Sequence, residues 1–186
     1  MTTAGAFAQI ANVKAAEKIA GSGDKADFNE ARRLIKEALA NDETKNDPYT
    51  WYVAGLIDRE NFNVEQKKSL LDASADKTPM YVALANVIPT WLQVYTLEAA
   101  DGKGKLKYSK KGKEALLVDY QQLLNAGSYY FDQKKYAEAA DVFDKFLDVK
   151  RSALFADEKA VSEIDSQAMN IAYYAIASAY TANEYG

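Results

Sequence analysis

The sequence predicts an all-α fold, a stack of about three to four antiparallel helix hairpins. Apolar residues recur at helical spacing nearly everywhere along the 186 residues. Only three prolines and nine glycines are present, which leaves little room for the many turns of a β-sandwich. A chain of this length fits one domain and can bury a sizeable core.

The clearest hairpin lies in residues 123–149. Large, small and aromatic residues alternate there at the spacing of two packed helices, at Leu123, Ala126, Gly127, Tyr130, Tyr136, Ala139, Phe143 and Phe146. Two helices approach to roughly 8–10 Å only where small side chains meet, and Gly127 and Ala139 supply them. Glycine inside a helix costs about 1 kcal/mol relative to alanine, so Gly127 indicates a packing requirement.

This pattern resembles the tetratricopeptide repeat (TPR). Residues 50–57 (TWYVAGLI), a lysine-rich GKGKLKY segment and residues 125–131 (NAGSYYF) follow in an order that resembles exported TPR proteins of Bacteroidetes. The resemblance to these exported proteins implies location and architecture, a right-handed stack of hairpins, rather than activity. The resemblance to TPR arrays in general implies binding of an extended peptide or protein partner on the concave face.

The N-terminus predicts export. Residues 1–8 resemble the remnant of a secretory signal peptide, because Ala6-Phe7-Ala8 forms the small-x-small pattern that precedes cleavage. We therefore expect a periplasmic protein with a single helical domain over residues 9–186. A frayed, alanine-rich terminus is the alternative interpretation.

Residues 9–46 are predicted to form a degenerate first repeat. Its first helix, over residues 10–20, is short. Its second helix begins where Asp27 and Glu30 stand three residues apart, the spacing of a reciprocal capping box.

Residues 47–100 are predicted to form the next repeat. Asp47 and Pro48 are typical of a helix start, since proline's missing N–H is harmless in the first turn. The segment that follows matches the repeat pattern at Trp51, Ala54 and Gly55. Asp58 departs from that pattern, because it stands where tyrosine is expected.

The second half of that repeat is expected to be interrupted. We predict that residues 61–78 are an insertion with its own short helix. A partner helix over residues 80–98, kinked at Pro89, would follow. A whole additional repeat between Gly55 and Gly127 is the alternative.

Three further segments complete the predicted organisation. Residues 101–113, with six lysines, are expected to form a lysine-rich loop. Residues 114–151 contain the best-matching repeat. Residues 165–186 are interpreted as the first helix of a further, truncated or capping repeat, with packing positions at Tyr173, Ala177 and Tyr180.

Composition excludes several classes of function. The chain has no histidine and no cysteine, which rules out Ser–His–Asp and Cys–His catalysis and zinc sites with those ligands. Its net charge of −4 has the wrong sign for general nucleic-acid binding. No stretch approaches the ~20 apolar residues of a transmembrane helix. We expect no catalytic residue, no metal and no cofactor, since Asp141, Asp144 and Asp148 fit the solvated side of a helix.

The candidate partner-binding site lies on the concave face of the predicted stack. Repeat register assigns to it Tyr49, Tyr52, Arg59, Gln121, Phe131, Asp132 and Tyr174. The same register turns further residues inward, namely Leu56, Glu60, Leu124, Ser128, Ile171 and Ser178. Exposed tyrosines suit peptide recognition, since they add contact area at low entropic cost. Packing of Tyr52, Phe131 and Tyr174 between adjacent repeats is the alternative.

The sequence therefore predicts a non-enzymatic scaffold for protein–protein interaction. One alternative is a structural or oligomerisation module of an envelope assembly, self-associating through the C-terminal helix. Another is a carbohydrate-binding envelope protein in which Trp51 and Trp91 stack on sugars. The lysine cluster could also bind anionic lipid headgroups or polyanions, or form a solvated loop.

Overall fold

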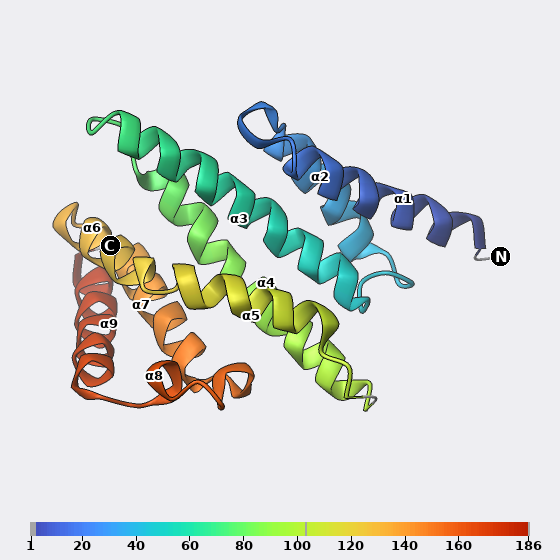
Figure 1. The fold of residues 1–186 in the computed structure, drawn as a ribbon. Helices are drawn as coiled ribbons and strands as arrows, with labels where there is room; N and C mark the ends of the chain where they lie inside the picture. The colour runs from blue at the N-terminus through green and yellow to red at the C-terminus, as the bar shows by residue number, and fades with distance from the viewer. Residues whose placement is uncertain (1–2, 103, 186) are drawn as a thin grey trace. The chain divides into compact units, whose positions relative to one another are not determined.

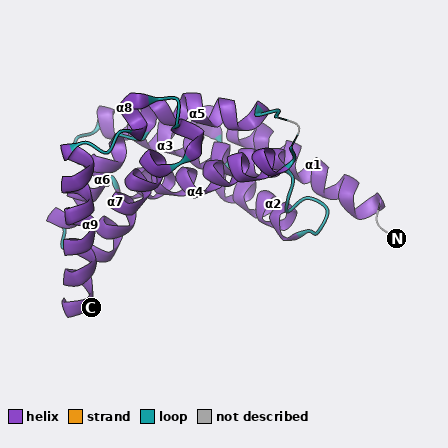
Figure 2. Cartoon of the chain, turned by 90° about the horizontal axis from the view of Figure 1, so that it is seen from below, coloured by secondary structure: helices purple, strands orange, loops and turns teal. Residues whose placement is uncertain are grey.

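The computed structural model describes residues 3–102 and 104–185, and all regular elements within them are helices (Figures 1 and 2). The all-α prediction is confirmed. The chain forms two compact units, residues 1–112 and 113–186, whereas the sequence analysis expected one domain over residues 9–186. The boundary between the units falls inside helix α5 (Lys107–Asp119).

The first unit contains four complete helices and the start of α5. These helices are α1 (Thr3–Ala20), α2 (Phe28–Ala40), α3 (Pro48–Leu71) and α4 (Thr78–Ala100), with a short 3₁₀ turn η1 (Gly23–Lys25) before α2. Helix α1 packs against α2 and α3, and α3 packs along α4. Residues 3–8, interpreted above as a signal-peptide remnant, are the first residues of α1.

Both predicted helix starts at aspartates are confirmed. The Asp27 carboxylate accepts a hydrogen bond from the Glu30 backbone N–H at 3.0 Å, and Asp47 accepts one from the Tyr49 N–H at 3.2 Å. The Glu30 carboxylate bonds Arg33 at 2.7 Å, on its own helix, rather than completing the expected capping box.

The expected insertion over residues 61–78 is corrected by the structure. Residues 61–71 continue α3 without interruption, and only a short turn separates α3 from α4. The apolar face of the helix extends into this stretch, because Phe62 is only 1% exposed, and no glycine or proline breaks it. The expected partner helix is α4, which includes Pro89 in its interior.

Helices α3 and α4 meet at Gly55 and Trp91. A Cβ atom on Gly55 would lie 2.3 Å from Trp91 Nε1, so no side chain fits there. The indole N–H donates to the Tyr52 carbonyl at 3.1 Å, and the Tyr52 ring stacks on the indole with 6.0 Å between centroids. Gly112 of α5 also contacts the indole, since a Cβ there would lie 3.2 Å from the ring.

The predicted lysine-rich loop over residues 101–113 is partly a helix, because α5 begins at Lys107. Glu98 of α4 explains this start. Its carboxylate, in a residue only 6% exposed, accepts backbone hydrogen bonds from Tyr108 and Ser109 at 2.9 Å each. The Ser109 hydroxyl donates to it as well, at 2.5 Å. A carboxylate that satisfies free N–H groups at a helix N-terminus stabilises that terminus.

The second unit contains the end of α5 and the best-matching hairpin. Its elements are α6 (Gln122–Asp132), α7 (Tyr136–Arg151), the 3₁₀ turn η2 (Ala153–Phe155), α8 (Lys159–Ser162) and α9 (Ser166–Tyr185). Helix α7 packs against α6 and α9. The hairpin over residues 123–149 is α6–α7, and the close contact predicted at Gly127 is present. A Cβ there would lie 2.1 Å from Phe143 Cε1.

Two of the three packing positions that the repeat pattern predicted on α9, Tyr173 and Tyr180, are exposed. Ala168, Ile171, Ala175 and Ser178 are buried, whereas Tyr173 and Tyr180 are 68% and 66% exposed. The described part of the chain includes no further helix against these tyrosines. Two neighbours on the same face are also exposed, so α9 carries an apolar stripe, here called the α9 stripe, of Met169, Tyr173, Ile176 and Tyr180.

Candidate functional site

The second unit holds a groove between α6 and α9, called the α6–α9 groove below. Its volume is about 270 Å³, and its lining residues are Leu124, Ser128, Phe131, Asp132, Phe143, Ile171 and Tyr174. Helix α6 supplies four of these residues at a spacing that places them on one helical face. Its other face packs on α7 through residues that include Gly127.

Aromatic rings form much of the groove. Phe143 is 4% exposed, and its ring centroid lies 6.3 Å from that of Tyr174. Phe131 is 39% exposed and meets Tyr136 edge to face at 5.3 Å. The exposed Asp132 and Ser128 add a negative charge and a hydroxyl to this apolar surface.

The structure brings together most of the predicted site residues of this unit. Phe131, Asp132 and Tyr174 line the α6–α9 groove, as do three of the further inward-facing residues, Leu124, Ser128 and Ile171. Two predicted residues do not line it. Gln121 is exposed and donates to the Tyr120 hydroxyl at 3.3 Å, and Ser178 is fully buried with its hydroxyl unbonded among the described atoms.

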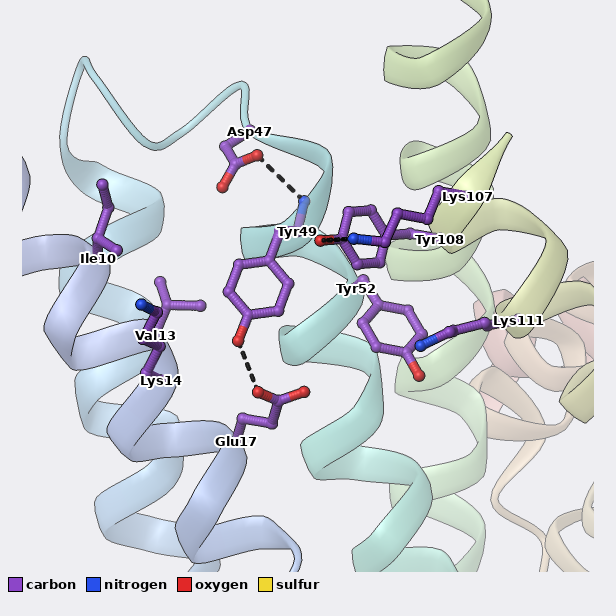
Figure 3. A pocket seen from close by; sticks show the side chains of 10 residues that line it. All are labelled: Ile10, Val13, Lys14, Glu17, Asp47, Tyr49, Tyr52, Lys107, Tyr108 and Lys111. Atoms are coloured by element: carbon purple, nitrogen blue, oxygen red, sulfur yellow. Dashed lines mark hydrogen bonds between the residues drawn. The ribbon is translucent and has the colours of Figure 1, made fainter. Parts of the chain in front are cut away.

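Tyr49 and Tyr52 lie in a separate pocket of the first unit. We call it the tyrosine–lysine pocket, and it has a volume of about 480 Å³ (Figure 3). Helices α1, α3 and α5 and the residue before α3 line it with Ile10, Val13, Lys14, Glu17, Asp47, Tyr49, Tyr52, Lys107, Tyr108 and Lys111. Arg59, the third site residue predicted in this unit, lies further along α3 and does not line the pocket.

Three tyrosine rings meet in this pocket. The Tyr108 ring centroid lies 5.4 Å from that of Tyr49 and 5.3 Å from that of Tyr52. The Tyr49 hydroxyl donates to Glu17 at 2.6 Å, as the dashed line in Figure 3 shows. Burial, and then the hydrogen bond to Glu17 and its negative charge, raise the pKa of Tyr49 well above its usual value of 10. Burial likewise raises the pKa of Tyr52.

Two lysines of α5 lie over these rings. Lys107 Nζ is 4.6 Å from the centre of the Tyr108 ring and donates to its hydroxyl at 3.1 Å. That hydrogen bond, and then the partial charge of the hydroxyl, raise the pKa of Lys107. Lys111 Nζ lies 5.9 Å from the centre of the Tyr52 ring.

Sequence reasoning missed the contributions of α1 and α5 to this pocket. Lys107, Tyr108 and Lys111 were assigned to a loop, and Glu17 to a helix without a ligand-facing role. The four-residue spacing of Lys107 and Lys111 was the available signal, because residues four apart share one face of a helix. The lysine segment has more than one environment, since Lys113 forms ion pairs with Asp157 and, at 3.3 Å, with Glu158.

The two tryptophans line neither cavity. Trp91 is 2% exposed, so its ring cannot stack on a ligand. Trp51 is partly exposed, and its indole N–H donates to the Lys45 carbonyl at 2.6 Å. The interpretation of these two side chains as a sugar-stacking pair is therefore not supported by their positions.

No group of three or more acidic side chains in residues 3–102 and 104–185 is placed to hold a metal ion. Asp141 forms an ion pair with Lys145 one turn away on α7. No helix within the same residues is long and apolar enough to cross a membrane.

Fold and cavities together define an all-α protein of helix hairpins, with a groove in one unit and a tyrosine-lined pocket in the other. Comparison of the chain with protein families, with curated proteins and with solved structures finds no match. The resemblance to exported TPR proteins, the right-handed stacking and the export therefore stay predictions from the sequence.

Proposed function

We propose that the protein is a non-enzymatic scaffold that binds a peptide segment of a partner protein in the α6–α9 groove. The observation that carries the proposal is the lining of this groove. Its four α6 residues, Leu124, Ser128, Phe131 and Asp132, are all ones that the repeat register turns toward a ligand, and Tyr174 of α9 lines the groove with them. A periplasmic location is part of the proposal and depends on the sequence of residues 1–8 alone.

The chemistry of the groove suggests what the peptide contributes. Phe131, Phe143 and Tyr174 offer aromatic surface for a large apolar side chain, and buried aromatic anchors dominate binding energy in most interfaces. Asp132 places a carboxylate beside them, which favours a neighbouring lysine or arginine on the peptide. We therefore expect a motif of one bulky apolar residue next to a basic one.

The test is selection of peptides from a random phage-displayed library on the immobilised protein. The best peptide is then synthesised, and its affinity is measured by fluorescence anisotropy. We expect Tyr174→Ala to weaken binding about tenfold or more, the usual effect of removing an aromatic anchor. We expect Asp132→Asn to remove the preference for the basic residue.

A second tyrosine of α9 provides the matched control. Tyr180 is 66% exposed and does not line the groove. Tyr180→Ala should leave the affinity within about twofold of the unaltered protein, the range of a near-neutral contact. Equal losses from both alanine variants, or selection of no common motif, would refute the proposed groove.

A second candidate function, self-association through α9, is favoured by the α9 stripe. Its four residues are 61–70% exposed and recur at the four-then-three spacing of a coiled-coil seam. Two such stripes packed together would bury roughly 1,000 Å², near the lower limit for a specific interface. We therefore propose a weak homodimer as the alternative assembly.

Analytical ultracentrifugation over a range of concentrations tests this alternative. We expect the mass of the unaltered protein to rise with concentration and that of Ile176→Lys to stay monomeric. Val118→Lys is the control, because Val118 is similarly exposed, at 73%, and lies on α5 of the same unit. An unaltered protein that is monomeric at roughly 100 μM would exclude a dimer with a Kd of about 100 μM or tighter and would refute this alternative.

A further inference from the structure

We propose that the tyrosine–lysine pocket of the first unit binds a small anion built on a six-membered ring, such as an acidic sugar or a nucleotide. This site is separate from the α6–α9 groove, and it does not depend on the peptide-binding proposal. The ligand class follows from two sets of side chains that share the pocket, three tyrosines and three lysines.

The tyrosines provide the surface for the ring. Tyr49, Tyr52 and Tyr108 are each half-buried, so part of each side chain is accessible from the pocket. Tyr49 and Tyr52 also pack against the core of the first unit. Aromatic faces of this kind stack on planar bases, and their apolar surface suits the C–H face of a sugar ring.

The lysines provide the charge for the anionic group. Lys14, Lys107 and Lys111 line the pocket together with two carboxylates, Glu17 and Asp47. Both carboxylates already accept hydrogen bonds from the protein, Glu17 from the Tyr49 hydroxyl and Asp47 from the Tyr49 N–H and the Thr50 hydroxyl. Lys107 contacts the ring and the hydroxyl of Tyr108, and Lys111 contacts the ring of Tyr52. An ammonium group has three N–H donors, so both lysines can still pair with a carboxylate or phosphate.

The pocket is held in shape before any ligand arrives. Tyr52 is stacked on the buried Trp91, whose N–H bonds the Tyr52 carbonyl. The backbone of Tyr108 is fixed by Glu98, and the Tyr49 hydroxyl by Glu17. Side chains that are already ordered lose little entropy on binding, and a volume of about 480 Å³ lies in the range of small-molecule sites.

Calorimetric titration of the full chain with two matched pairs of probes tests the proposal. One pair is glucuronate and glucose, and the other is uridine monophosphate and uridine. We expect the anionic member of at least one pair to bind about tenfold more tightly than its neutral counterpart, the effect of one charge-assisted hydrogen bond. The pair that shows the difference distinguishes an acidic sugar from a nucleotide.

Variants of α5 assign the binding to the pocket. Lys111→Met keeps the apolar stem and removes the charge, and it should weaken the anionic probe about tenfold. Lys110→Met is the matched control, because Lys110 is the adjacent, exposed lysine and does not line the pocket. It should leave the affinity unchanged, and circular dichroism should show both variants folded.

A third variant tests the role of Glu17. Tyr49→Phe keeps the ring but removes the hydroxyl that donates to Glu17. The carboxylate then faces the pocket unpaired, so the anionic probe should bind more weakly while any binding of the neutral probe is retained. Three results would overturn the proposal. They are equal affinity for charged and neutral probes, equal losses of affinity in Lys111→Met and Lys110→Met, and no binding of any of the four probes.

Discussion

Asp58 occupies the position where the TPR pattern has tyrosine, and the structure shows a different contact in its place. The side chain is nearly buried, and the Arg32 guanidinium of α2 donates to its Oδ1 from Nη2 at 2.6 Å and from Nε at 3.0 Å. An ion pair thus joins α2 to α3 at this point. Burial raises the pKa of the Asp58 carboxyl above 3.8, and the hydrogen bond and charge of Arg32 oppose this only in part.

This raised pKa predicts a pH dependence of stability. Ionising Asp58 costs more free energy in the folded state than in the unfolded state. The contribution of protonated Asp58 to the free energy of unfolding is therefore complete below about pH 4 and is lost as the pH rises through the pKa of the folded state. Urea unfolding of the unaltered protein and of Asp58→Asn, at steps from about pH 3.5 to 7, measures this. We expect the unaltered protein to lose stability relative to the variant as the pH rises.

The comparison with Asp58→Asn cancels the other carboxyl groups, which both proteins share. If instead the unaltered protein gained stability relative to the variant as the pH rises, the effect of Arg32 on the pKa of Asp58 would be larger than the effect of burial. The pKa of Asp58 would then be lowered instead of raised.

Gly127 is a position of the second unit that has no room for a side chain. Replacing it by alanine adds a Cβ that would lie 2.1 Å from Phe143 Cε1, so the ring or the helix must shift. We expect Gly127→Ala to lower the free energy of unfolding by about 1–3 kcal/mol, although alanine is the better helix former. The lower melting temperature should be partly restored by Phe143→Leu in the same chain.

Gly21→Ala serves as the control for this substitution. A Cβ there would be 3.5 Å from its nearest neighbour, the Glu17 carbonyl oxygen, which is ordinary contact. Its melting temperature should therefore change little. An unchanged melting temperature for Gly127→Ala would mean that α6 and α7 are farther apart than described.

At the scale of elements, the start of α5 depends on one side chain from another helix. We expect Glu98→Ala to lower the free energy of unfolding by about 2 kcal/mol, because two backbone N–H groups and a hydroxyl lose their buried acceptor. Hydrogen exchange should become faster at the amides of Tyr108 and Ser109.

Glu114→Ala is the matched variant on α5 itself, because Glu114 is exposed. It should leave the exchange of the Tyr108 and Ser109 amides unchanged. If Glu98→Ala also leaves it unchanged, the first turn of α5 is held by contacts other than this carboxylate.

The elements show where sequence reasoning succeeds. Asp27 and Asp47 were predicted correctly as helix caps and Gly127 as a close contact, because a cap acts within three residues and a glycine inside a helical pattern is conspicuous in the sequence alone. The start of α5 could not be found in this way, since its stabilising carboxylate lies ten residues earlier in another helix. The tyrosine–lysine pocket was missed for the same reason, because Tyr108 lies in the first turn of α5 and contacts Tyr49 and Tyr52 only when α5 begins there.

At the scale of the whole molecule, the two units differ in their tryptophan content. Both tryptophans, Trp51 and Trp91, belong to the first unit, so tryptophan fluorescence reports on that unit, whereas circular dichroism reports on both. We expect Gly127→Ala to lower the midpoint temperature of the transition seen by circular dichroism and to leave the midpoint seen by tryptophan fluorescence unchanged. Gly55→Ala, whose Cβ would meet Trp91 at 2.3 Å, should shift the fluorescence midpoint instead. Coincident shifts of both signals in both variants would show that the chain unfolds as one cooperative body.

The composition of α9 affects the direction in which the α9 helices of two protein copies would align. Residues 166–183 contain no lysine, arginine, aspartate or glutamate, so a pair of α9 stripes has no charges beside its seam to choose between parallel and antiparallel alignment. An aligned antiparallel pair closes on itself with two-fold symmetry and stops at two copies. A staggered pair leaves apolar surface uncovered at each end and can add further copies. If the proposed self-association through α9 holds, concentrated solutions are therefore expected to contain open-ended filaments beside discrete dimers.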